Sequence, residues 1–126
     1  MKQHSPGFLR LAEAARARIR EVSADELAAR QKRGERFILL DVREDHEWDA
    51  GHLPSAEHLG RGILERDLET RYPDPHADIV VYCGGGYRSA LAADTLHALG
   101  YDRVRSLAGG YRGWAEANRP VEGKKS

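Results

Sequence analysis

Ile79-Val-Val-Tyr-Cys83-Gly-Gly-Gly-Tyr-Arg88-Ser89 decides the fold, because it combines a buried strand, a glycine turn and a helix start. The β-branched and aromatic residues from Ile79 to Cys83 are typical of a strand that is buried on both faces. The three glycines that follow predict a tight turn, and the apolar spacing beyond them predicts a helix over 88–99. A strand that leads directly into a helix is the repeating unit of parallel α/β sheets.

Strands and helices alternate along the rest of the chain. Apolar runs predict strands at 20–22, 37–42, 56–59 and 104–107. Helical segments are expected after Ser23, which forms a capping-box pattern with Glu26, and at 43–48, 63–70 and 111–118. An additional amphipathic helix is predicted over 8–19. The fold class is therefore α/β, an open, mainly parallel sheet with helices on both faces plus an extra N-terminal helix.

Composition excludes several classes of protein. The 126 residues hold 20 Lys and Arg against 20 Asp and Glu, and this balance argues against nucleic-acid or membrane binding as the main role. No apolar run is long enough to span a bilayer, and the first residues lack a secretory signal, so we expect a cytoplasmic protein. Cys83 is the one cysteine, which excludes an intrachain disulfide and a resolving thiol from the same chain.

The chemistry is expected at Cys83. Ligands of open parallel sheets bind beyond the carboxyl ends of the strands, and Cys83 stands at such an end. The glycine turn can direct backbone N–H groups toward one centre, and the helix that follows adds its positive end. These donors and Arg88 favour an anion and the thiolate form of the cysteine. The alternative is a cysteine that only packs in the core, but packing does not require three glycines, an arginine and a helix start to converge.

These residues resemble the active-site loop of the rhodanese (sulfurtransferase) family. Asp41-Val-Arg-Glu44, with Glu47, Trp48 and Gly51-His-Leu-Pro-Ser-Ala56, resembles the first signature of that family. Leu107-Ala-Gly-Gly-Tyr-Arg-Gly-Trp114, followed by Pro120, resembles the last one. The resemblance implies a five-stranded sheet and a rhodanese-like domain over 20–120, with an N-terminal helical extension at 1–19 and a polar tail at 121–126.

The resemblance implies that sulfane sulfur moves from an anionic donor such as thiosulfate to a thiol or cyanide acceptor. Cys83 would be the nucleophile that carries the persulfide, and Arg88 the electrostatic partner of the donor. A protein donor or acceptor also fits the family, and no cofactor, nucleic acid or membrane is implied. The remaining substrate-binding residues would be those whose backbone forms the cradle, namely Gly84, Gly85, Gly86, Tyr87 and Ser89.

Three other functions use the same loop. A persulfide carrier would be charged only by a partner protein. Related cysteine phosphatases and arsenate reductases have one more residue in the loop, whereas four residues separate Cys83 from Arg88 here, a spacing that suits a single terminal sulfur. The run from Gly84 to Ser89 also approaches a dinucleotide fingerprint, but its third glycine is replaced by serine.

Polar residues outside the loop receive weaker predictions. Asp41 and Arg43 are candidates for supporting roles, either by orienting a group of the site or by bracing the local backbone. His46, His52 and His58 recur every six residues, a spacing that matches neither a helix face nor a zinc motif, so no metal site is predicted.

Overall fold

A five-stranded sheet forms the centre of the fold, and all its paired strands run parallel. The computed structural model describes residues 4–123. The strands lie in the order β1-β5-β4-β2-β3. This order confirms the predicted parallel α/β sheet and puts the strand before Cys83 in the middle. The bounds are β1 (Arg20–Val22), β2 (Ile38–Asp41), β3 (Glu57–His58), β4 (Ile79–Tyr82) and β5 (Val104–Leu107).

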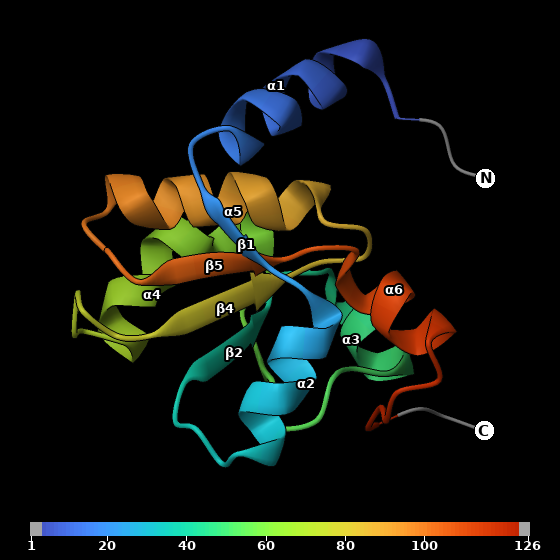
Figure 1. Cartoon of the computed structure of the whole chain (residues 1–126). Helices are drawn as coiled ribbons and strands as arrows, with labels where there is room; N and C mark the ends of the chain where they lie inside the picture. Colours follow the sequence, from blue (N-terminus) through green and yellow to red (C-terminus); the bar gives the residue numbers. More distant parts are fainter. Residues whose placement is uncertain (1–3, 124–126) are drawn as a thin grey trace.

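Helices cover both faces of the sheet, as predicted (Figure 1). α4 (Leu64–Arg71), preceded by the short helix η1 (Arg61–Ile63), and α5 (Tyr87–Ala98) lie on one face. α2 (Ala24–Lys32) and α6 (Gly110–Glu116) lie on the other. β4 contributes Ile79 and Val81 to the first core and Val80 and Tyr82 to the second. This alternation explains why its sequence is apolar throughout.

Several element ends differ from the sequence prediction. β4 ends at Tyr82, so Cys83 is the first residue after the strand and not its last residue. Ser23 caps α2 by accepting a hydrogen bond from the Glu26 amide at 3.1 Å, but the Glu26 carboxylate pairs with Arg33 and leaves the predicted capping box half formed. The reciprocal capping box belongs to α3 (Asp45–Ala50), where it joins Glu44 and Glu47.

The N-terminal helix packs against α5 as an outer layer (Figure 1). It spans α1 (Pro6–Arg16) and not 8–19, because the chain must become extended by Arg20 to pair with β5. Ala12 and Ala15 are fully buried against the domain, whereas Leu11 on another face is 59% exposed. Small residues on the inner face therefore allow the two helices to approach closely.

The C-terminal segment returns to the domain within the described residues. Glu122 and His52 exchange two backbone hydrogen bonds of 2.8 and 2.9 Å. Residues 124–126 of the predicted tail, like residues 1–3 of the extension, lie outside the described part of the chain. None of the helices within 4–123 is long and apolar enough to cross a membrane.

Candidate active site

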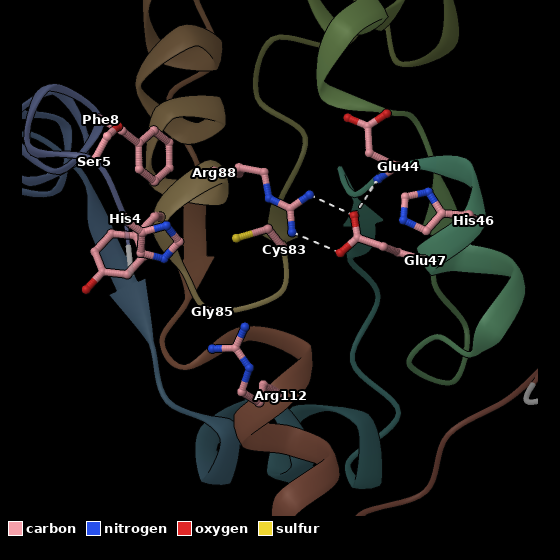
Figure 2. Close-up of a pocket in the computed structure, with 11 residues that line it drawn as sticks. His4, Ser5, Phe8, Glu44, His46, Glu47, Cys83, Gly85, Arg88 and Arg112 are labelled. Carbon is pink, nitrogen blue, oxygen red and sulfur yellow. Dashed lines mark hydrogen bonds and ion pairs between the residues drawn. The ribbon is translucent and has the colours of Figure 1, made fainter. Parts of the chain in front are cut away.

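Cys83 lies at the base of a pocket at the carboxyl end of β4 (Figure 2). The pocket has a volume of about 600 Å³, and the cysteine side chain beneath it is a free thiol that is only 1% exposed. Lining residues come from α1, α3, the loop after β4, α5 and α6, and include His4, Phe8, Glu44, His46, Glu47, Gly85, Tyr87, Arg88 and Arg112. The pocket therefore offers a small molecule a route to the sulfur between polar and aromatic side chains.

The Cys83 sulfur is held by hydrogen bonds from the loop that follows it. The amides of Gly86 and Ser89 donate to Sγ at 3.1 and 3.2 Å, and the Ser89 hydroxyl oxygen lies 3.4 Å from Sγ. Ser89 Oγ is in turn 2.8 Å from Ser106 Oγ on β5. Donors aimed at the sulfur stabilise negative charge on it, which is what a nucleophilic thiolate requires.

Further backbone amides around the sulfur are available to a ligand. The amides of Gly84, Gly85, Tyr87 and Arg88 make no hydrogen bond to any acceptor within residues 4–123. They surround the beginning of α5, whose N-cap residue is Gly86 with a left-handed φ of +105°. Converging unpaired N–H groups at a helix N-terminus form an anion-binding cradle. The role of these amides as an anion cradle stays a prediction.

A second glycine turn, after β5, fixes the position of the loop from behind. The amides of Tyr111 and Arg112 donate to the carbonyl oxygens of Cys83 and Gly84 at 2.8 and 2.9 Å. Gly110 has a φ of +57°, and a Cβ atom there would lie 2.5 Å from the Cys83 oxygen. Only glycine allows this approach, so α6 can pack directly against the Cys83 loop.

Arg88 lines the pocket but is bound to an acidic partner. Its two terminal nitrogens donate to the two carboxylate oxygens of Glu47 at 2.7 and 3.0 Å (Figure 2). The hydrogen bonds from Arg88 lower the pKa of Glu47 to about 2. The expected role of Arg88 as the partner of an anionic donor stays a prediction, and in this structure its charge is already balanced.

Asp41 and Arg43 form a buried brace beside the site and do not line the pocket. The Asp41 carboxylate is fully buried and accepts bonds from the Arg43 amide, Nε and Nη2 at 2.8 to 3.1 Å. Arg43 Nη2 also donates to the Gly51 carbonyl at 2.6 Å, and its guanidinium lies 4.2 Å from the centre of the Tyr111 ring. The pair thus ties the end of β2 to α3 and α6.

Seven pocket residues were not predicted as site residues from the sequence, namely His4, Ser5, Phe8, Glu44, His46, Glu47 and Arg112. Arg112 stands two residues after Gly110 of the second glycine turn, and this position beyond the carboxyl end of a neighbouring parallel strand is the signal that could have identified it. Glu47 carried no such signal, because its partner Arg88 is 41 positions away. His4 and Phe8 contact the Tyr87 ring and reach the site only because α1 docks on α5.

The histidines of the chain do not form a metal centre in the part that the structure describes. No group of three or more His, Cys, Asp or Glu residues within 4–123 is arranged to hold a metal ion. Of the three regularly spaced histidines, His46 lines the pocket, whereas His52 stacks on Trp48 with ring centres 3.5 Å apart. His58 Nε2 lies 2.8 Å from the carbonyl oxygen of Arg43.

Comparison with known proteins identifies relatives along most of the chain. Residues 23–117 match the model of the rhodanese-like domain family. A sulfurtransferase of Allochromatium vinosum is 31% identical over 103 residues, which cover 82% of this chain and 94% of the relative. A solved protein of unknown function from Rhodopseudomonas palustris CGA009, a possible tyrosine phosphatase, superposes with a TM-score of 0.82 at 30% identity, covering 97% of this chain and 99% of that one. The polysulfide-sulfur transferase of Wolinella succinogenes superposes with a TM-score of 0.79 at 29% identity, covering 95% and 89%.

Proposed function

The chain belongs to the rhodanese-like domain family, and we propose that it is a sulfurtransferase that carries sulfur as a persulfide on Cys83. The observation that carries this proposal is the buried thiol, which accepts hydrogen bonds from the Gly86 and Ser89 amides beneath an open pocket. The four neighbouring amides that make no hydrogen bond within residues 4–123 supply donors for a second sulfur atom. A cysteine with a purely structural role would not need this arrangement.

The proposed donor is a small anion with a sulfane sulfur, such as thiosulfate. The Cys83 thiolate attacks the outer sulfur, a new S–S bond forms, and the S–S bond of thiosulfate breaks so that sulfite leaves with the electron pair. The persulfide carries the negative charge, which the loop amides stabilise. A thiol or cyanide then takes the outer sulfur and restores the thiolate. Polysulfide is a donor of the same class, and the Wolinella succinogenes relative supports it.

A phosphatase activity is less well supported by the same geometry. Four residues separate Cys83 from Arg88, so the loop is one residue shorter than in the related phosphatases. Phosphate ester hydrolysis also calls for a general acid that protonates the leaving oxygen. Glu47 is a poor acid for this purpose, because Arg88 lowers its pKa to about 2 and keeps it ionised. Sulfite leaves without such help.

Steady-state turnover tests the proposal and separates it from a carrier role. With thiosulfate and cyanide, the wild-type protein should form thiocyanate over many cycles, and Cys83→Ser should form none. Charging by a protein donor alone, with no turnover of thiosulfate or polysulfide, would instead support a persulfide carrier. The single thiol must stay reduced for either role, and we therefore place the protein in the cytoplasm, where thiols persist.

A further inference from the structure

Two guanidinium groups flank the glycine loop above Cys83. An ideal Cβ atom on Gly84 would lie 3.0 Å from Nη2 of Arg88, and one on Gly85 would lie 3.1 Å from Nη1 of Arg112. Both arginines line the pocket together with Cys83. The loop glycines therefore leave room for two cationic side chains as well as for the turn itself.

The two arginines differ in their surroundings. Arg88 is held by the Glu47 carboxylate through two short hydrogen bonds, which balance its charge. The side chain of Arg112 makes neither an ion pair nor a hydrogen bond within residues 4–123. Its backbone is nevertheless fixed, because the Arg112 amide donates to the Gly84 carbonyl at 2.9 Å. Arg112 is thus a positioned cation with unused donors at the mouth of the site.

The two carboxylates of the pocket are engaged with partners other than Arg112. Figure 2 shows Glu44 and Glu47 on the α3 side of the site, while Arg112 approaches Gly85 from α6 below the loop. The Glu44 side chain accepts the amide of Glu47 as part of the α3 capping box, and Glu47 is paired with Arg88. On the α6 side of the pocket opening, a negatively charged ligand therefore meets a guanidinium that has no carboxylate partner within residues 4–123.

We propose that Arg112, and not Arg88, is the residue that binds the anionic end of the sulfur donor. This inference rests on the proposed function, because it places the outer sulfur of the donor in the cradle beside Cys83. The sulfonate of thiosulfate, or the far end of a polysulfide, then projects into the open part of the pocket. The planar guanidinium of Arg112 can donate two parallel hydrogen bonds to such a group. Arg88 instead holds the loop in place through Glu47.

Binding to a protein that cannot react tests this role without relying on turnover. In the Cys83→Ser background, thiosulfate binding is measured by titration calorimetry, with and without Arg112→Gln. We expect the Kd to rise about 10-fold or more with Arg112→Gln, since hydrogen bonds between charged groups are the strong ones. Arg112→Lys should retain part of the affinity. The matched control is Arg103→Gln, which removes an exposed arginine just before β5, at the opposite end of the sheet.

Kinetics of the reactive protein provide the second measurement. Arg112→Gln should raise KM for thiosulfate about 10-fold while kcat stays within about threefold, the pattern expected when ground-state binding is lost. An unchanged Kd and KM in Arg112→Gln, or the same loss in Arg103→Gln, would overturn the role of Arg112. Absence of thiosulfate binding in the Cys83→Ser protein would overturn it as well. Turnover by the wild-type protein with an unaffected Arg112→Gln would leave the sulfurtransferase proposal standing and reject only this inference.

Discussion

The position of the Arg88 side chain is determined by its hydrogen bonds to Glu47. Its hydrogen bonds to Glu47 join the first turn of α5 to α3, so the side chain links two elements on either side of the pocket. Both side chains are about one-third exposed or less, and water therefore screens the pair only in part. Removal of either partner leaves a charge in the wall of the site.

Arg88→Ala tests the electrostatic contribution of this pair. We expect kcat/KM for thiosulfate to fall about 10- to 1000-fold, because the loop loses its anchor and Glu47 becomes an unpaired negative charge near the thiolate. Arg88→Lys should recover little, since an ammonium group cannot make the two parallel bonds. Steady-state assays provide the measurement. Wild-type turnover in Arg88→Ala would show that the site does not need the Arg88–Glu47 pair for sulfur transfer.

The acid stability of the fold should depend on Glu47. Its pKa in the folded protein is about 2, below the ordinary value of 4.5, mainly because of the hydrogen bonds from Arg88. A lowered carboxyl pKa contributes stability that is present above pH 4.5 and is lost as the pH falls toward 2. Urea unfolding between pH 4.5 and 2 should show a smaller decrease in the free energy of unfolding for Glu47→Gln than for the wild type. Equal decreases in the two proteins would show that the Arg88–Glu47 pair does not contribute to the acid dependence of stability.

We expect the length of the loop after β4 to determine which reaction the site supports. Two of its amides already point at Sγ, and the second glycine turn holds its carbonyl groups from behind. Such a loop cannot adjust to an extra residue without moving some of its donors. Its size should therefore separate sulfur transfer from phosphate chemistry.

Insertion of one glycine after Gly85 tests this dependence on length. We expect most thiosulfate activity to be lost, because displacement of reacting groups by about 1 Å can cost on the order of a hundredfold. We expect this variant to gain only weak binding of phosphate and not to hydrolyse an aryl phosphate efficiently, because the insertion supplies no general acid. A glycine inserted beside the exposed Arg36, between α2 and β2, is the control. Undiminished sulfur transfer by the longer loop would contradict the argument.

The sequence predicts which segments form strands and helices better than it predicts where these elements end or how they pack against one another. The apolar run from Ile79 and the glycines after Cys83 determine a strand, a turn and a helix to within a residue, because both patterns are local. Pairing of Arg88 with Glu47 depends on the order of strands in space, which local patterns do not contain. The amphipathic pattern of α1 likewise predicts a helix but not that Phe8 will line the pocket.

At the scale of the whole molecule, the strand order assembles the site. β4 lies between β2 and β5, so the segments that follow these three strands meet at the carboxyl edge of the sheet. α3 brings Glu47 from one side, and α6 brings Arg112 from the other. α1 adds a wall in which His4 and Phe8 contact Tyr87. A buried thiol, its hydrogen-bond donors and the Arg112 guanidinium, which has no ion-pair partner within residues 4–123, thus converge on one pocket.

Intact-protein mass spectrometry after incubation with thiosulfate tests the central claim most directly. The reduced wild-type protein should gain the mass of one sulfur atom, and the gain should disappear when cyanide is added. Cys83→Ser should gain no mass under the same conditions. No added sulfur on the wild type with thiosulfate or polysulfide, or an equal gain in Cys83→Ser, would contradict a persulfide on Cys83.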